Sequence, residues 1–181
     1  MAQWKIDAVH SEVNFKVKHL VVATVRGQFD KFDAIIETGT EDFSDAKIKF
    51  EAETNSINTR NNDRDAHLKS PDFFDAENYG KISFVSDSVK KISDHELKVN
   101  GSLTIRGITK KVTLNVIYNG IVDGMGGSKV AGFEISTSLN RFDYGLKWNA
   151  LTEAGGVMVG NEVGIEILAE FNKAQSLVKA A

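Results

Sequence analysis

Apolar residues recur at every second position through most of this 181-residue chain. In the stretch from Glu12 to Leu20, for example, Val13, Phe15 and Val17 share one side and lysines lie on the other. Successive side chains of a β-strand point to opposite faces, so this period predicts a strand with one buried and one solvated face. The same alternation returns in four later stretches, at 97–105, 112–118, 131–139 and 163–171. We therefore expect an all-β protein.

The expected strands are long, number about eight and are joined mostly by short turns. One proline and fifteen glycines suit an antiparallel sheet with glycine at its turns. Antiparallel sheets of this size form barrels or sandwiches, and an eleven-residue strand spans roughly 36 Å at ~3.3 Å per residue. This length favours an elongated, eight-stranded antiparallel β-barrel, whose interior is just wide enough for side chains or one small ligand.

The segment 61–75 breaks the strand pattern and contains Pro71, the single proline. Its first half is expected to form about two helical turns. Ser70 before Pro71 has the sequence of an N-cap followed by proline at the first position of a second short helix. We therefore expect one broken helical insertion that brings Phe73 and Phe74 against one end of the barrel.

Length and composition limit the class of protein. The chain suits a single domain, expected over residues 1–172, with a C-terminal tail over 173–181. There is no cysteine, which excludes disulfides and thiolate chemistry. The net charge is −3, and acidic and basic residues are mixed along the chain. This pattern does not indicate binding to nucleic acid or to an anionic membrane surface. No run of about 18 apolar residues occurs, so no integral membrane segment is expected.

The first residues, MAQWKIDAVHS, lack the basic and apolar regions of a signal peptide. As the sequence is written, we expect a cytoplasmic protein. If Met1 replaces a removed signal, the expected location is periplasmic or secreted.

The inward-facing apolar residues form the candidate site, and two interpretations of them remain open. They either fill a solid core or line a tunnel for a long hydrocarbon chain. Each buried CH₂ contributes ~0.8 kcal/mol, so a long tail binds tightly without any polar contact. His19, Phe74 and Trp148 are added to this set at the mouth of the barrel. The predicted lining is then Val13, Phe15, Val17, His19, Phe50, Phe74, Phe84, Leu103, Ile105, Leu114, Val116, Phe133, Ile135, Trp148, Ile165 and Ile167.

Polar residues near the expected mouth also have two interpretations. His19 is in phase with the inward-facing residues and lies near a strand end. It is either a hydrogen-bonded core histidine or a contact to a ligand headgroup at the mouth of the barrel. Arg64, Asp65 and His67 either pin the helix to the barrel rim or form a headgroup site in which Arg64 pairs with phosphate.

No residue pattern indicates catalysis. The four histidines lack close metal-ligand spacing, and neither a G-x-S-x-G elbow nor a phosphate loop is present. We therefore expect no enzyme, no metal and no cofactor. Arg141 and Asp143, two apart in a strand-end loop, are expected to form a local salt bridge.

Six blocks of the chain form a specific combination. The most specific is Ser56-Ile57-Asn58-Thr59 followed by RDAHLKS at 64–70 and DFFD at 72–75. The other blocks are WKIDAVHS at 4–11, GQF at 27–29, GSLTIRGITK at 101–110, RFDYG at 141–145 and VGNEV at 159–163. With these blocks, the chain from Trp4 to about Glu170 resembles the YceI-like family of polyisoprenoid-binding proteins.

The resemblance implies a lipocalin-like barrel that binds a long amphiphile, such as a polyprenyl chain or quinone tail, for transport, storage or sequestration. Some relatives are thought to carry other amphiphiles, including fatty acids or their amides. The resemblance also implies a homodimer and does not imply catalysis. Two alternatives remain: a non-binding structural or stress-response module with a filled core, and an enzyme that acts on a bound lipid or quinone.

Overall fold

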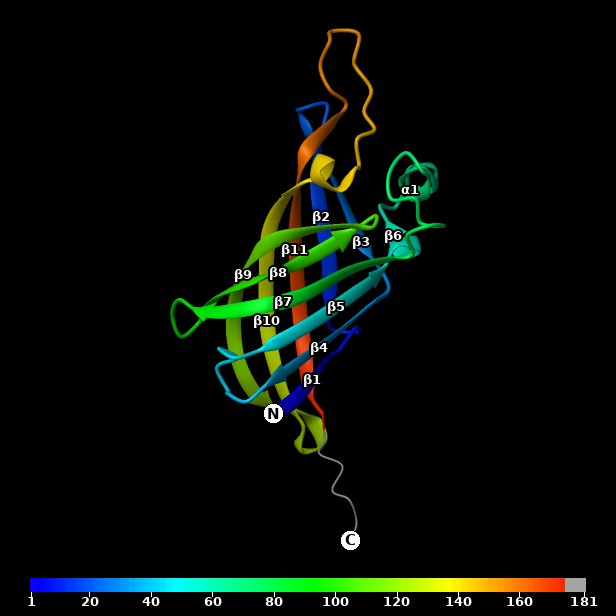
Figure 1. Ribbon diagram of the computed structural model, residues 1–181. Coiled ribbons are helices and arrows are strands. Elements are labelled where there is room, and N and C mark those ends of the chain that lie inside the picture. The colour runs from blue at the N-terminus through cyan, green and yellow to red at the C-terminus, as the bar shows by residue number, and fades with distance from the viewer. Residues whose placement is uncertain (175–181) are drawn as a thin grey trace.

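Residues 1–174, which the computed structural model describes, form a closed antiparallel β-barrel with one short α-helix (Figure 1). The strand order is β1-β4-β5-β7-β8-β9-β10-β11-β2-β3-β6, and pairing of β1 with β11 closes the barrel. The predicted fold class is therefore confirmed. The strands are β1 Ala2–Ile6, β2 Glu12–His19, β3 Ala23–Phe29, β4 Phe32–Thr38, β5 Lys47–Glu53, β6 Ile57–Asn58, β7 Lys81–Lys91, β8 Glu96–Ile105, β9 Ile108–Asp123, β10 Lys129–Asn140 and β11 Val159–Lys173.

Three strands of the barrel are each divided into two segments. Both β1 and β2 pair with β11. On its other side, β1 pairs with β4, and β2 pairs with β3. In the same way, β5 pairs with β4 and β6 pairs with β3. If each divided strand is counted once, the barrel has the predicted eight strands.

The division between β3 and β4 occurs where the alternation of apolar residues breaks. The strand pairing stops at Asp30 and Lys31. Their backbone N–H groups donate to the carbonyl oxygen and to Oγ of Ser56, at 3.1 and 3.0 Å. At this interruption the long strand bends, so that β3 continues beside β2 and β4 continues beside β1.

The helical insertion consists of α1 (Asn62–Lys69), capped by the side chain of Asn61. Ser70 ends this helix and does not begin another. Its N–H and its hydroxyl both donate to the carbonyl oxygen of His67, at 3.1 and 2.7 Å, and residues 71–74 form turns. The second helix expected here was wrong: Ser70 Oγ does accept from the N–H of Asp72 at 3.3 Å, as an N-cap would, but the residues that follow form only turns. Within residues 1–174, no helix has the length and apolar character needed to cross a membrane.

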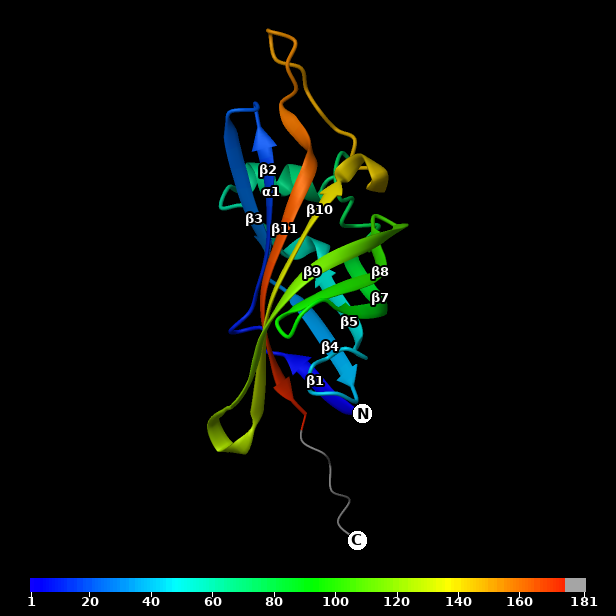
Figure 2. The same ribbon diagram turned by 90° about the vertical axis from the view of Figure 1, so that its left-hand side faces the viewer.

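The two ends of the barrel carry different elements (Figures 1 and 2). The α1 end bears α1, the 3₁₀ turn η1 (Thr54–Ser56) and the 3₁₀ turn η3 (Arg141–Tyr144). At the opposite end, called the β1 end, strand β1 begins and the 3₁₀ turn η2 (Met125–Gly127) connects β9 with β10. Lys173, the first residue of the expected tail, is still part of β11 and pairs with Trp4. Residues 175–181 of that tail lie outside the described residues.

Two clusters of buried apolar side chains occupy these ends. The cluster at the β1 end includes Trp4, Phe43 and Phe133. The cluster at the α1 end includes Phe29 and Phe73. The space between them is not filled by side chains, and this space is the candidate site.

Candidate ligand-binding cavity

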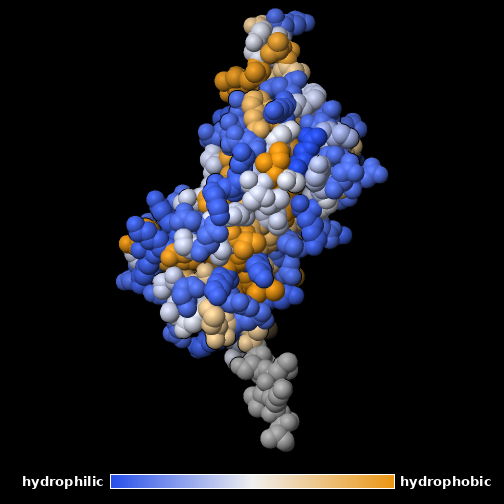
Figure 3. Space-filling model, viewed as in Figure 1, coloured by the Kyte–Doolittle hydropathy of each residue, from blue (hydrophilic) through white to orange (hydrophobic). Residues whose placement is uncertain are grey.

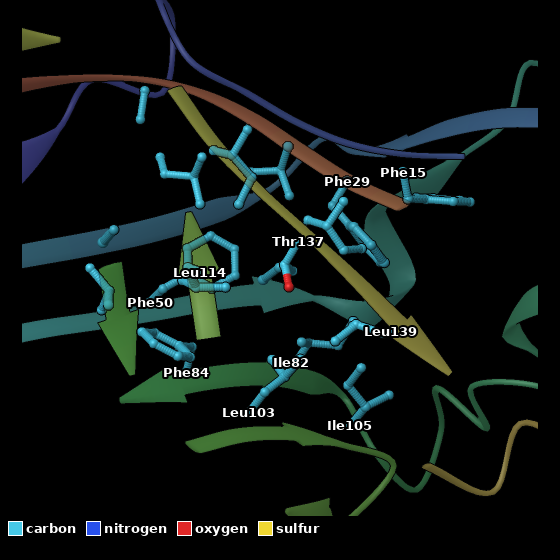
Figure 4. A pocket seen from close by; sticks show the side chains of 18 of the residues that line it. Phe15, Phe29, Phe50, Ile82, Phe84, Leu103, Ile105, Leu114, Thr137 and Leu139 are labelled. Carbon is cyan, nitrogen blue, oxygen red and sulfur yellow. The ribbon is translucent and has the colours of Figure 1, made fainter. Parts of the chain in front are cut away.

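An apolar cavity of about 240 Å³ lies inside the barrel. Figure 4 shows side chains from facing strands, among them Phe50, Phe84 and Leu114, converging on this space. The volume greatly exceeds the roughly 10–15 Å³ that one water molecule requires. The surface that the wall presents to the cavity is apolar throughout. A ligand there would be held by burial of its hydrocarbon and not by hydrogen bonds.

The antiparallel register places the side chains of the wall next to one another. Phe50 pairs with Phe84, and Phe84 pairs with Leu103, which forms one row across β5, β7 and β8. A second row crosses β9, β10, β11 and β2, with neighbours paired in the order Val116, Ile135, Ile167 and Val13. Because side chains alternate between the two faces, every second residue of these strands contributes to the wall and the residues between them face the surface.

All residues predicted to line a tunnel lie in the cavity wall except His19 and Trp148. His19 is half-buried at the end of β2. Trp148 covers the α1 segment, with its ring centroid 4.7 Å from that of His67 and 5.4 Å from that of Phe73. The contact of any of these residues with a ligand stays a prediction.

The wall also contains residues that the sequence analysis did not select. Ile48 and Ile82 share the alternation of Phe50 and Phe84, so the same signal could have found them. Phe43 lies in the loop between β4 and β5 with a φ of 57°, and no periodic pattern marks it. Further residues missed at the α1 end are Leu68, Leu139, Arg141 and Leu146, and Phe73, expected to pack at this end, and Tyr144, expected to line or cover the mouth, also lie in the wall.

Arg141 is 4% exposed, and its guanidinium bonds to the backbone of the loop that leads into β11. The predicted salt bridge with Asp143 was wrong, because no ion pair of Arg141 occurs in the part of the chain that the structure describes. Burial lowers the pKa of Arg141 from its ordinary value. The guanidinium donates instead to four carbonyl oxygens, those of Gly160, Leu146, Trp148 and Val159, at 2.8, 2.5, 2.8 and 3.3 Å.

Tyr144 follows in the same turn, and its side chain is buried in the cavity wall. Its hydroxyl finds no hydrogen-bond partner within residues 1–174. Burial, helped by the nearby charge of Asp143, raises the pKa of Tyr144 to about 12. The phenol is therefore protonated at any ordinary pH, and a buried polar group without a partner destabilises the folded state.

The three predicted rim residues lie in α1, where two of them contact Thr59, the residue that follows β6. Arg64 donates from Nε to Oγ1 of Thr59 and from Nη2 to its carbonyl oxygen, at 2.7 and 2.8 Å. Asp65 accepts from the N–H and hydroxyl of Thr59, at 2.8 and 2.6 Å. His67 Nε2 lies 2.9 Å from Oδ2 of Asp72. These bonds hold α1 against the barrel rim, and a role in contacting a headgroup stays a prediction.

One group of metal-ligating side chains lies outside the cavity, between β1 and β2. His10 Nδ1 lies 3.0 Å from Oδ2 of Asp7 and 4.0 Å from Oε1 of Glu170. The bond to Asp7 raises the pKa of His10, and the same bond lowers the pKa of Asp7. The arrangement is that of a hydrogen-bonded ion pair with a second carboxylate beside it.

Known proteins resemble this chain in both sequence and fold. A model of the YceI-like domain matches residues 4–171. The UPF0312 protein SAS2572 of Staphylococcus aureus strain MSSA476 is 43% identical over 173 residues, which cover 95% of this chain and 98% of that protein.

Two solved structures share the fold. BcnA of Burkholderia cenocepacia superposes with a TM-score of 0.77 at 21% identity, covering 91% of this chain and 98% of BcnA. A polyisoprenoid binding domain from Saccharophagus degradans, implicated in plant cell wall breakdown, gives a TM-score of 0.66 at 15% identity, covering 94% and 98%. At these identities the similarity establishes the barrel fold.

Proposed function

The chain belongs to the family of YceI-like domains, and from this premise we propose that the protein binds one long-chain amphiphilic lipid inside its barrel. The lipid tail, an isoprenoid, polyprenyl or quinone tail, would occupy the cavity between the two ends. The observation that carries the proposal is the apolar cavity of about 240 Å³, with a wall built by alternate residues of the barrel strands. Binding of this kind serves carriage, storage or sequestration of the lipid.

The energetics of an apolar wall support this choice of ligand. Each CH₂ moved from water into the cavity contributes ~0.8 kcal/mol, so a chain of several isoprene units gains enough free energy without a polar contact. A shared fold with a polyisoprenoid binding domain of another organism agrees with this class of ligand.

The proposal is one of binding without catalysis. Arg141 and Tyr144 are the polar residues that contribute to the cavity wall near η3. The guanidinium of Arg141 is engaged by backbone carbonyl oxygens, and the phenol of Tyr144 stays protonated. Neither group is therefore available as a base toward a bound lipid.

Native mass spectrometry of the protein, purified without detergent from cells, tests the proposal. We expect a bound species of lipid mass that organic solvent releases and that can then be identified. Protein stripped of lipid should also take up an added prenol. A protein that carries no lipid and takes up no prenol would contradict the proposal.

Two adjacent residues of β7 provide a matched pair of variants for this experiment. Phe84 lies in the cavity wall, whereas Val85 points to solvent from the outer face. A buried, unpaired guanidinium is strongly unfavourable, so Phe84→Arg should abolish lipid uptake and lower stability. Val85→Arg should retain both. Equal lipid content in the two folded variants would show that this face of β7 does not contact the lipid.

A further inference from the structure

The turn between β2 and β3 carries aliphatic residues at positions that favour other residue types. His19 pairs with Ala23, so the turn consists of Leu20, Val21 and Val22. Leu20 and Val21 have φ angles of 51° and 64°, in the left-handed region where glycine, asparagine and aspartate are common and β-branched residues are strained. Val21 and Val22 are 73% and 87% exposed. Neither backbone conformation nor packing within the protein explains these three side chains.

A second loop, residues 145–158, projects beyond the barrel at the same end (Figures 1 and 2). Leu151 and Val157 face each other as an isolated β-bridge. Leu151 is 74% exposed, and Val157 is also exposed. From Trp148 to Gly160 the sequence contains a single charged residue, Glu153.

The two loops form one protrusion. The N–H of Leu20 donates to the carbonyl oxygen of Met158 at 2.9 Å. Figure 3 shows hydrophobic residues on this protrusion, together with hydrophilic residues at its end. We call the exposed side chains of the two loops the aliphatic tip, which consists of Leu20, Val21, Val22, Leu151 and Val157.

The aliphatic tip is continuous with the cavity wall. Val17 of β2 lines the cavity, and β2 runs directly into the first loop. Val159 and Val163 of β11 also line the cavity, and the second loop leads into them. The tip therefore lies beyond the α1 end of the cavity.

We propose that the aliphatic tip inserts into the surface of a lipid bilayer and thereby places the α1 end of the cavity against the membrane. This inference rests on the proposed function and adds where the lipid is acquired. A bilayer interface is fluid and accepts a thin convex protrusion, whereas a protein partner requires a complementary shape. Exposed Lys18 and Lys147 flank the two loops at positions suited to lipid phosphates.

Co-sedimentation with vesicles of phosphatidylcholine, alone or mixed with phosphatidylglycerol, tests the inference on the complete chain. We expect the protein to bind both kinds of vesicle. Val21→Asn removes an aliphatic side chain and relieves the strained backbone, so this variant should be at least as stable as the original. Two variants should each reduce the bound fraction at least tenfold. One is the double variant Val21→Asn with Val22→Asn, and the other is Leu151→Asp.

The hairpin at the β1 end provides the matched control. Val122 and Met125 are 65% and 96% exposed there, as aliphatic as the tip and equally free of packing. Val122→Asp and Met125→Asp should leave vesicle binding unchanged. Equal loss in these controls, or vesicle binding by the tip variants at the original level, would overturn the inference. So would a change in oligomeric state of the tip variants without a change in vesicle binding.

A separate measurement distinguishes this inference from the proposed function. Tip variants that receive a prenol from detergent micelles should still hold it, as judged by native mass spectrometry. Prenol bound in the cavity together with unimpaired vesicle binding by the tip variants would overturn only the inference about the membrane. A chain that binds no prenol from any source would remove the proposed function and the inference with it.

Discussion

The two ends of the barrel are closed by different kinds of contact. At the β1 end, the buried ring of Phe43 packs against Trp4, Tyr118 and Phe133 at centroid distances of 5.3, 5.4 and 5.0 Å. Aromatic rings bury large apolar areas and contribute further through their edge-to-face geometry. Opening this end would expose all of that area to water.

At the α1 end, aromatic rings also pack, with centroid distances of 6.0 Å for Phe29 and Phe74 and 5.4 Å for Phe73 and Trp148, but hydrogen bonds hold the segments that carry these rings. The guanidinium of Arg141 holds the loop after η3, and Thr59 holds α1 through Arg64 and Asp65. Such bonds can be exchanged for bonds to water, so their net contribution is only about 1 kcal/mol each, more when charged. From this comparison we expect the β1 end to stay sealed and the α1 end to open more readily. We therefore expect a ligand to enter and leave at the α1 end.

The largest effect is expected at the sealed end, from Phe43→Ala. Removal of a fully buried phenylalanine leaves a cavity, and the free energy of unfolding should fall by about 3–5 kcal/mol. Denaturant unfolding measures this loss, with the exposed Met125→Ala as a control that should change little. A loss below about 1 kcal/mol would show that the aromatic cluster does not seal this end.

A smaller and more local effect is expected from Arg141→Leu. The variant leaves buried carbonyl oxygens without a donor, each costing about 1–3 kcal/mol when no water replaces it. Hydrogen exchange in residues 146–160 should accelerate, and a bound lipid should exchange faster, while the β1 end remains protected. Arg26→Leu is the control, because Arg26 forms only a surface ion pair with Glu166 at 3.5 Å. Uniform acceleration across the barrel would contradict separate behaviour of the two ends.

Tyr144→Phe should have a small effect of the opposite sign. The hydroxyl has no partner within residues 1–174, so its removal relieves a desolvation penalty. We expect the free energy of unfolding to be unchanged or to rise by about 1 kcal/mol. Clear destabilisation, measured by denaturant unfolding, would mean that the hydroxyl has a partner such as an ordered water.

The smallest effect concerns Asp7 and His10, which lie between the two ends. The raised pKa of His10 adds stability that is present below its ordinary value of 6.5 and is lost as the pH rises through the folded value. The lowered pKa of Asp7 adds stability that is present above its ordinary value of 3.8 and is lost as the pH falls through the folded value. The pair therefore stabilises the folded protein most between pH 3.8 and pH 6.5, the ordinary pKa values of Asp7 and His10. His10→Ala should lower the Tm at about pH 5 and not at about pH 8, and an equal shift at both would contradict the pairing.

The barrel wall could be predicted from the sequence because a strand has a period of two. Alternation alone predicts that Phe84, Leu103 and Ile135 face inward, and all three lie in the cavity wall. Positions in loops carry no such period. The sequence therefore did not reveal that Phe43 reaches the interior from a loop with a left-handed backbone.

Polar contacts were harder to predict than apolar ones. Arg141 was paired with Asp143 because the two are close in sequence, but its actual partners are carbonyl oxygens of a loop whose path no pattern encodes. Ser70 has the neighbours of an N-cap and its hydroxyl accepts from the N–H of Asp72, yet it also bonds to His67 at the end of α1, and only turns follow. In both cases the choice depends on which backbone groups the fold leaves unpaired.

Binding of a series of prenols of increasing length to the lipid-free protein tests the central claim most directly. If the tail lies inside the apolar cavity, each added CH₂ contributes ~0.8 kcal/mol, and the Kd falls by about fourfold per carbon. We expect this tightening to continue until the cavity is filled and then to stop. A Kd that is independent of chain length would show that the hydrocarbon does not enter the barrel.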